Sequence, residues 1–571
     1  MVIIVTRSGH NHFKSIKEHH KSEGSTDMKK ANYIVIAVLI LVIVVAGVIV
    51  AVALTNNSKT YTYAVGDFIF TRRGSEVTLK EYKGSDTEVQ VTDIIDGFKV
   101  TAIGERAFYG NETVEKVVAP STVTSIGAEA FSGAKKLRNI SMKGLVKIGE
   151  QAFSGCTSLN NLLITESLKE IGARAFYGCS ALQDLNYIYN EDYTVRSSLE
   201  RVGAFAFKNT KIDTILIPES LKTIGENAFA SMKLQAIVFY EGVETIEENA
   251  FAYDNTTTRN VFTFDRQSDK SVLDRYASDF KSKYIKDVSK QNYFPESLKT
   301  IGDGAFRYDK SSKSGLGGSL VFGKNLVSVG EAAFENTRVS GVKFDNANTE
   351  IGAYAFANTS ISSVSLPENI KILKEGVFLR CSINNEVVLP KSVETIETGA
   401  FAGNNRTSFK ISINEESPAA KKYVFASVDG IKTLKSKDGK VLYSIHSSSV
   451  SEGENGLTLL ENVSVIESYA FSAVTTVNGS ATFATVSIPE TVKEIRAGAF
   501  ADADVNNFNL LHSSLDFTID KRAFDARYTT VKEDEKAVLR VRKGGDILAA
   551  MQKIFEGSSY VVVTTIGSSL A

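Results

Sequence analysis

The sequence predicts a repeat solenoid of the α/β or mainly β class, built from short parallel strands, capped at both ends and preceded by one transmembrane helix. Three observations predict it: a length of 571 residues, a six-residue element that recurs along the chain, and one long apolar segment near the N-terminus. One hydrophobic core stops growing at about 250–300 residues, so a chain of this length is either several domains or an open repeat array. The recurring element favours the array.

The apolar segment from Tyr33 to Leu54 contains no charged residue. At a rise of about 1.5 Å per residue, a helix of this length crosses a hydrocarbon core of roughly 30 Å. Four lysines between residues 17 and 30 precede it, whereas only Lys59 lies in a comparable stretch after it. Positive charge marks the cytoplasmic side. We therefore predict a cytoplasmic tail at 1–32, a signal-anchor helix at 33–54 that attaches the protein to the cell membrane, and an extracellular remainder.

A cleaved secretory signal is the alternative to an anchor. Met28 would then be the true start, and Ala51-Val52-Ala53 fits a small-residue cleavage site. The apolar part of a signal peptide usually spans about 7–15 residues, which is shorter than this segment and favours the anchor. Both alternatives export the same repeats.

The recurring element has the form Ile/Val-Gly-x-x-Ala-Phe and begins with IGERAF at 103–108. Where nothing interrupts the series, successive phenylalanines are 22 or 23 residues apart, which lies in the range of leucine-rich repeats. The residues that we expect to form the structural core of the repeat close fifteen such elements: Phe108, Phe131, Phe153, Phe176, Phe207, Phe229, Phe251, Phe306, Phe334, Phe356, Phe378, Phe401, Phe471, Phe500 and Phe524.

A second apolar pattern lies between these elements, as in Ile215-x-Ile217-Pro218. The alternation is typical of a strand with one buried face, and the proline ends it because it cannot donate the next ladder hydrogen bond. One unit offers only about six buried side chains, too few to offset the ordering entropy of its residues, so the units must stack into a curved solenoid. We expect the glycine after Ile to allow a turn conformation that a side chain would disfavour.

The repeated IGxxAF element, the two-part period and the Ile-Pro strand ends resemble the BspA-like leucine-rich-repeat family of bacterial and protist surface proteins. The resemblance extends from about Val65 to Val541, and FIFTRRGSEVTLKEYKG resembles the family's opening cap. It implies an exported or anchored protein that mediates adhesion and partner recognition. It does not name a ligand.

The predicted organisation after the helix is a linker and N-terminal cap at 55–100, a solenoid at 101–528 and a C-terminal cap at 529–571. Insertions near 252–295 and 402–460 interrupt the period. In the first, apolar residues recur every fourth position from Val272 to Tyr284, which predicts an amphipathic helix packed on the solenoid.

The second insertion contains Asp429-Gly430 and Asp438-Gly439 beside short apolar runs, which predicts β-hairpins. A contribution of either insertion to binding stays open. In the C-terminal cap we expect a strand at 537–541, a turn at Gly544-Gly545 and an amphipathic helix at 546–555.

The composition argues against nucleic-acid binding, catalysis and metal binding. Lysine plus arginine total 65 and aspartate plus glutamate total 66, a net charge of −1 that excludes nucleic acid as an electrostatic partner. His446 and His512 are the only histidines after residue 20. We predict no catalytic, cofactor or metal site, so the protein is not an enzyme, and we expect His446 to be solvated in a polar loop.

The three cysteines, Cys156, Cys179 and Cys381, each follow a repeat phenylalanine by three residues, so we interpret them as positions of the repeat. A disulfide between the first two stays open, because they occupy adjacent units.

Together these features predict a cell-surface protein that mediates adhesion or protein–protein recognition through an extracellular solenoid. The partner would be an extracellular or host macromolecule, in first place a protein. A self-associating surface-coat protein without a specific ligand is the alternative, and an enzyme would need a pocket within an insertion. Outward strand residues such as Ser363 and Thr485 are small and polar, so no aromatic anchor can be named. The ligand and the oligomeric state stay open.

Overall fold

The computed structural model describes residues 59–189, 195–232, 234, 236–253, 260–261, 263–264, 291–308, 313–428, 431–446, 460–472, 485–503, 507–528, 536–542 and 546–566. The cytoplasmic tail and transmembrane helix predicted at 1–32 and 33–54 lie outside these residues, as does the helix predicted from Val272 to Tyr284. Within the described ranges, no helix combines the length and the apolar character that a bilayer crossing requires. The chain divides into two compact units, residues 1–62 with 71–75 and residues 63–70 with 76–571.

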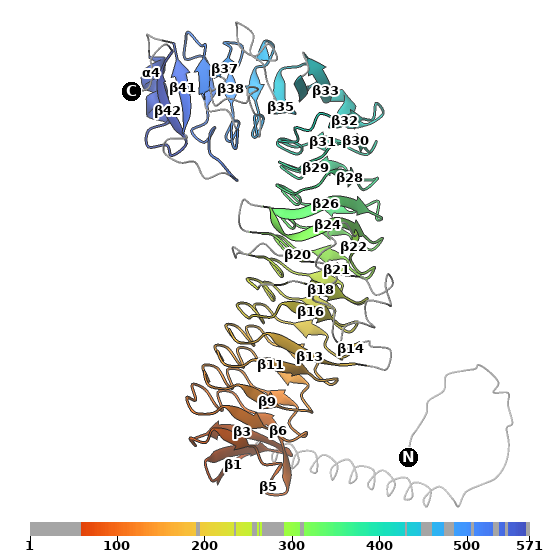
Figure 1. Ribbon diagram of the computed structural model, residues 1–571, viewed down its shortest axis with the longest axis vertical. Helices are drawn as coiled ribbons and strands as arrows, with labels where there is room; N and C mark the ends of the chain where they lie inside the picture. The colour runs from red at the N-terminus through yellow and green to blue at the C-terminus, as the bar shows by residue number, and fades with distance from the viewer. Residues whose placement is uncertain are drawn as a thin grey trace, which may run out of the picture. The chain divides into compact units, whose positions relative to one another are not determined.

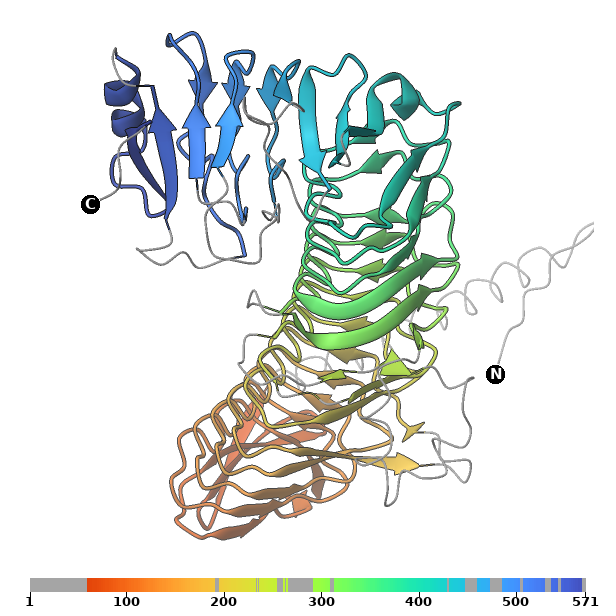
Figure 2. The ribbon, with the colours of Figure 1, turned by 45° about the horizontal axis from the view of Figure 1, so that its top comes forward.

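A ladder of very short parallel strands runs along the repeats of the larger unit. Most of its strands have two residues, the second being the Ile or Val that opens the IGxxAF element, and Ile148 pairs with Ile126 on one side and Ile171 on the other. Figures 1 and 2 show these strands and their turns lying side by side. The strands follow β1 (Thr60–Val65) and β2 (Phe68–Arg73) and are β3 (Glu76–Tyr82), β6 (Phe98–Ile103), β8 (Ser125–Ile126), β10 (Lys147–Ile148), β12 (Glu170–Ile171), β15 (Arg201–Val202), β17 (Thr223–Ile224), β19 (Thr245–Ile246), β23 (Thr300–Ile301), β25 (Ser328–Val329) and β27 (Glu350–Ile351), with β5 (Ile94–Ile95) antiparallel to β6.

A second set of strands comes from the apolar-x-apolar segments, as predicted. These strands pair mostly in parallel within several smaller sheets, so most repeats supply one strand to each set. They are β4 (Glu88–Gln90), β7 (Lys116–Val118) and β9 (Asn139–Ser141); β11 (Asn161–Ile164), β13 (Asp184–Tyr189) and β14 (Val195–Arg196); β16 (Thr214–Ile217), β18 (Ala236–Phe239) and β21 (Thr263–Phe264); β20 (Asn260–Val261), β22 (Gln291–Tyr293), β24 (Ser314–Phe322), β26 (Thr337–Phe344) and β28 (Ser363–Ser365); and β30 (Glu386–Leu389) and β32 (Lys410–Ile413).

The repeat phenylalanines form the centre of the core. All fifteen are buried. From Phe108 to Phe401 each ring stacks on the next with centroids 4.8 to 5.7 Å apart and interplanar angles of at most 14°. Aromatic pairs at this distance contribute about 0.5–1.5 kcal/mol beyond the area they bury. The backbone follows the same stack, because Phe153 N–H donates to the Ala175 carbonyl of the next repeat at 2.7 Å. A single isolated repeat would have neither the ring stacking nor the hydrogen bond between repeats.

The glycine of the IGxxAF element is needed for close stacking and not for its backbone conformation. A Cβ on Gly149 would lie 2.7 Å from the carbonyl carbon of Gly127 in the preceding turn. The positive φ expected at that glycine is found two residues later, at Gln151, where φ is 54°. Where glutamate replaces the glycine, at Glu247, its carboxylate accepts a hydrogen bond from the Glu226 N–H at 3.0 Å.

The second insertion interrupts the stack between Phe401 and Phe471. It contains the 3-10 helix η2 (Pro418–Lys421) and the antiparallel strands β33 (Tyr423–Val428), β34 (Ile431–Ser436) and β35 (Val441–Ile445). The hairpin prediction is confirmed, although residues 429–430 themselves lie outside the described ranges. The apolar core of the described chain falls into two main clusters that meet at this insertion, one ending at Leu434 and the other beginning at Ile431.

The remaining repeats and the C-terminal end follow the insertion. The strand and the helix predicted there are confirmed as β41 (Ala537–Val541) and α4 (Ile547–Ile554), and α4 buries Ile547 and Met551. The turn predicted at Gly544-Gly545 lies outside the described residues. The two-residue strands of this part are β29 (Ile372–Leu373) and β31 (Thr395–Ile396) before the insertion and β36 (Val465–Ile466), β38 (Glu494–Ile495) and β40 (Thr518–Ile519) after it; the last sheet comprises β37 (Thr485–Ile488), β39 (Asn507–Leu510), β41 (Ala537–Val541) and β42 (Val561–Thr565), beside α4 (Ile547–Ile554).

Candidate binding surface

The cysteines pack inside the turns as free thiols. Cys156 Sγ donates to the Phe131 carbonyl and Cys179 Sγ to the Phe153 carbonyl, each at 3.0 Å and each one repeat back. The bridge between them that the sequence left open is therefore absent from the structure. Burial raises the pKa of the Cys156 thiol to about 12, so it stays protonated and unreactive at neutral pH.

His446 is buried, so the expectation of a solvated loop histidine is wrong. Its ring lies against Phe409 and Phe425, with centroids 4.8 and 5.5 Å away, and only 1% of the residue is exposed. Burial lowers its pKa to about 3. Its Nε2 is 2.7 Å from the hydroxyl of Ser444, which is 2% exposed. This serine–histidine pair is closed to any substrate, so it stabilises the hairpin and presents no nucleophile.

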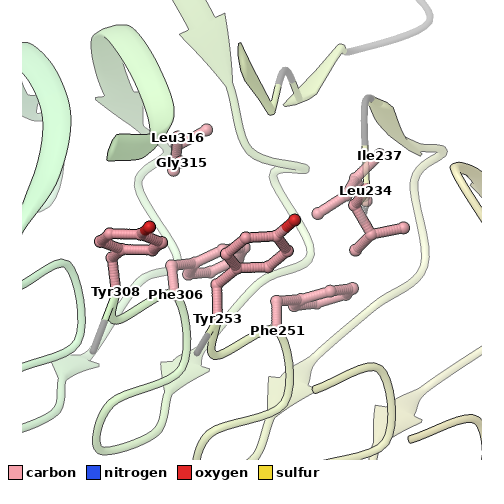
Figure 3. A pocket seen from close by; sticks show the side chains of 8 residues that line it. All are labelled: Leu234, Ile237, Phe251, Tyr253, Phe306, Tyr308, Gly315 and Leu316. Atoms are coloured by element: carbon pink, nitrogen blue, oxygen red, sulfur yellow. The ribbon is translucent and has the colours of Figure 1, made fainter. Parts of the chain in front are cut away.

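Figure 3 shows an apolar pocket where repeat rings meet β24. Phe251 stacks on Phe306 at 5.1 Å, and Tyr253 stacks on Tyr308 at 5.7 Å. The eight lining residues are Leu234, Ile237, Phe251, Tyr253, Phe306, Tyr308, Gly315 and Leu316. None of them is acidic or basic, and the described residues contain no group of three His, Cys, Asp or Glu side chains that could hold a metal ion.

The surface of the turns carries the exposed aromatic side chains of the repeats. We define the turn face by two positions of each repeat: the second x of IGxxAF, and the residue after Phe. The second x adopts positive φ, as at Arg106 (58°) and Arg174 (53°). Non-glycine residues adopt this conformation at a cost of about 1–2 kcal/mol. The ladder holds it in place, because Arg174 N–H donates to the Ala204 carbonyl of the next turn at 2.8 Å.

In the N-terminal repeats the turn face presents aromatic and cationic side chains in contact with one another. Tyr109 and Tyr177 are 50% and 36% exposed. The Arg106 guanidinium lies 4.0 Å above the Tyr109 ring. Further along, the Arg174 guanidinium is 5.0 Å and the Lys208 ammonium 5.4 Å from the Phe205 ring. We call this set the turn-face row: Arg106, Tyr109, Arg174, Tyr177, Phe205 and Lys208.

Tyrosine and arginine are the residues that most often dominate protein–protein binding energy. Cation–π contact holds the long arginine side chains in place, which reduces the entropy lost on binding. The row was not predicted from the sequence, because aromatic anchors were expected on the strands. The signal was nevertheless present, since tyrosine follows the repeat phenylalanine in YG at 109–110 and again at 177–178.

Further along, the same positions are covered by the C-terminal part of the chain itself. Ala332, Tyr354, Ala357, Leu379 and Ala402 are all buried and form an apolar cluster with Tyr528. Ala357, Leu379 and Ala402 occupy the position of Tyr109, directly after the repeat phenylalanine, and none of them is exposed.

Polar contacts of Arg527 and Tyr528 hold this part of the chain against the turns. We call these two residues and their contacts the clasp. The Arg527 guanidinium donates to Glu335 Oε1 at 2.9 and 3.1 Å and lies 3.7 Å above the Tyr354 ring. The Tyr528 hydroxyl donates to the same Glu335 oxygen at 2.8 Å. Burial, and then the charge of Glu335, raise the pKa of Tyr528.

Asp502 holds the backbone of the clasp residues in place. Its carboxylate accepts the backbone N–H groups of Arg527 at 3.2 Å and Tyr528 at 2.9 Å. Its carbonyl accepts the Arg380 guanidinium at 2.8 Å. Residues far apart in the sequence are therefore joined through side chains.

Comparison with known proteins places the repeats in a family. The family model of the BspA-type leucine-rich repeat region matches residues 87–193, 186–313, 276–403, 317–432 and 454–532, which together cover most of the chain. The chain belongs to the BspA-type leucine-rich repeat family. The predicted resemblance is thus confirmed. No curated protein matches the sequence.

Three solved structures of bacterial proteins are similar to this BspA-type chain. The pneumococcal vaccine antigen PcpA is 18% identical over 89% of this chain and 99% of its own, with a TM-score of 0.38. A leucine-rich-repeat protein of Bacteroides ovatus is 18% identical over 88% and 100%, with a TM-score of 0.36. A leucine-rich cell-surface protein of Faecalibacterium prausnitzii is 17% identical over 79% and 95%, with a TM-score of 0.33.

Proposed function

We propose that this BspA-type protein is a non-catalytic cell-surface receptor or adhesin that binds a protein partner through the turn-face row. The observation that carries the proposal is the exposure of Tyr109 and Tyr177 on one face, each on a turn that also presents an arginine. Family membership supports recognition of proteins as the general role of such repeats. Extended concave or flat surfaces of repeat arrays suit large partners better than small molecules.

The chemistry of the row defines the partner's complementary surface. The Arg106 Nε lies 3.8 Å from the Glu129 carboxylate, and 53% of the Arg106 side chain remains exposed. The row therefore favours a partner segment with carboxylates for the guanidinium groups and apolar or aromatic side chains between the two tyrosines.

We further propose that the segment from Tyr33 to Leu54 anchors the protein, with the N-terminus cytoplasmic and the repeats outside. A single span of this length supports attachment, and the lysines before it support the orientation. Secretion after signal cleavage is the alternative outcome. Protease treatment of intact cells distinguishes the two, because an anchored protein releases its repeats only under protease, whereas a cleaved one is already in the medium.

The binding proposal is tested with the purified repeats, fluorescently labelled, on cultured animal and bacterial cells. Binding should be saturable and should disappear when the target cells are treated with protease beforehand. Tyr109→Ala together with Tyr177→Ala should raise the half-saturating concentration by about thirtyfold or more, since each anchor contributes on the order of 1–2 kcal/mol.

The matched control removes exposed apolar side chains elsewhere in the repeats. Leu163 and Val388 are 41% and 65% exposed and lie on strands β11 and β30, away from the turns. Leu163→Ala with Val388→Ala should leave binding unchanged. Equal effects of both pairs would refute the row as the binding surface. Failure to bind any cell, together with concentration-dependent self-assembly in light scattering, would instead favour a surface-coat protein.

A further inference from the structure

Equivalent turn positions differ in exposure along the chain. Tyr109 and Tyr177 are 50% and 36% exposed, whereas Leu379 and Ala402, at the same place in later repeats, are fully buried. At Leu379 and Ala402 the burial involves Tyr528, which shares an apolar cluster with both residues. Ala230, at the same place in another repeat, is also buried but lies outside this cluster.

The clasp is separate from the two cores. Tyr354, Leu379 and Tyr528 belong to a small cluster of their own, outside both main apolar clusters. Opening it therefore exposes little of the main cores and breaks no bond of the phenylalanine ladder. Proteins open in local cooperative units as well as globally, and we expect the clasp to be one such unit.

The ionic contacts of the clasp also make it sensitive to competing charged groups. Its ionic attachment is to one carboxylate, Glu335, whose Oε1 accepts from both Arg527 and Tyr528. The Arg527 side chain remains 33% exposed, so water, ions and a competing charged segment can reach it. A partner that presents its own arginine and tyrosine could replace these two residues one for one.

We propose that the clasp is a reversible closure over a second half of the turn face, from Ala332 to Ala402. When it opens, this half accepts a protein segment that carries a cation and an aromatic ring in the places of Arg527 and Tyr528. The chain's own segment, seated on Glu335 and Tyr354, shows the chemistry that the face takes. The inference rests on the proposed function, because it regulates how much of the same face is available for binding.

Opening is measured without any partner. Ala357→Cys places a thiol beneath the clasp, and its rate of maleimide labelling reports opening. Arg527→Glu sets two carboxylates against each other and should raise that rate by at least about tenfold. Arg522→Glu is the matched control, since it makes the same charge change on a side chain that is 62% exposed and paired with Asp520 in the same loop.

A charge exchange separates clasp opening from misfolding. The double variant Glu335→Arg with Arg527→Glu restores an ion pair of reversed polarity and should return labelling towards the slow rate. The three native cysteines, all buried, give the baseline for global unfolding. Equal labelling rates in Arg527→Glu and Arg522→Glu, with unchanged circular dichroism, would overturn the reversible closure.

Binding to the cells described above then tests the second surface. The opened Arg527→Glu variant should reach half-saturation at a concentration about fivefold lower than Arg522→Glu, the least that one added anchor contributes. When the variant also carries Ala357→Cys, a polyethylene glycol chain on the introduced thiol should remove this gain. If Arg527→Glu opens the clasp without any gain, the second surface is refuted while the turn-face row stands. If the tyrosine variants also leave binding unchanged, the proposed function itself fails.

Discussion

Gly149→Ala is expected to push two stacked turns apart. The new Cβ would lie 2.7 Å from the carbonyl carbon of Gly127 and 2.8 Å from the amide nitrogen of Ala128. Both atoms belong to backbone, which cannot turn aside as the end of a side chain can. To regain an ordinary separation of 3.4 Å, the turns must move apart by about 0.7 Å.

The cost follows from the hydrogen bonds that cross this gap. Three of them, donated by the backbone N–H groups of Glu129, Phe131 and Gly149, measure 2.7 to 2.8 Å. A displacement of about 0.7 Å takes them to the limit of hydrogen bonding. With about 0.5–1.5 kcal/mol lost for each, the local free energy of opening should fall by about 2–4 kcal/mol. Amide exchange in these turns should accelerate by roughly thirtyfold to nine-hundredfold.

The matched control lies in the same repeat. Gly155 has φ of 72° and no atom within 4 Å of the position its Cβ would take. Gly155→Ala therefore adds only the cost of a left-handed alanine, about 1 kcal/mol, or roughly a fivefold acceleration.

Native-state hydrogen exchange followed by mass spectrometry, on peptides from 126–155, is the appropriate assay, because a repeat array opens locally and does not unfold as one unit. Similar acceleration in Gly149→Ala and Gly155→Ala would show that close stacking is not why glycine occupies this position.

Three further outcomes are expected. Because burial lowers the pKa of His446 to about 3, its neutral form stabilises the fold fully above the unfolded pKa of about 6.5, and the contribution is lost as the pH falls from 6.5 towards 3. The free energy of unfolding should therefore fall by about 2 kcal/mol between pH 7 and pH 5 in thermal unfolding experiments, and by less in His446→Gln. Equal decreases in the two proteins would show that buried His446 is not the cause. Since all three cysteines are free, a reducing agent should leave the midpoint of thermal unfolding unchanged, and a fall would reveal a bridge. Arg496→Ala removes the ion-pair partner of Glu467, which is 4% exposed, and should lower the free energy of unfolding in a urea titration by about 2 kcal/mol. Lys493→Ala breaks an exposed ion pair and should lower it by under about 1 kcal/mol. Equal decreases would contradict the expected effect of burial.

The repeat architecture was predictable because its signal is local and repeated. The same apolar side chains meet in every unit, so the period alone predicts that Phe131 stacks between Phe108 and Phe153. Turn chemistry is equally local, which is why the hairpin at Asp438-Gly439 could be read from the sequence.

Contacts between distant residues could not be predicted in this way. Glu335 and Arg527 are 192 residues apart, and each alone reads as an ordinary surface charge. His446 is buried because rings from Phe409 and Phe425 enclose it, and no sequence pattern near residue 446 predicts these contacts. The positive φ at Arg106 is imposed by bonds to the next turn, so it contradicts the local preference of arginine.

Site-specific photo-crosslinking is the most direct test of recognition through the turn-face row. A benzophenone amino acid replaces either Tyr109, in the turn-face row, or Leu163, an exposed position on β11. The two proteins are bound to intact cells and irradiated. We expect a defined protein adduct from position 109 and none from position 163. Adducts of equal yield from both positions, or an adduct from position 163 alone, would contradict recognition through the turn face.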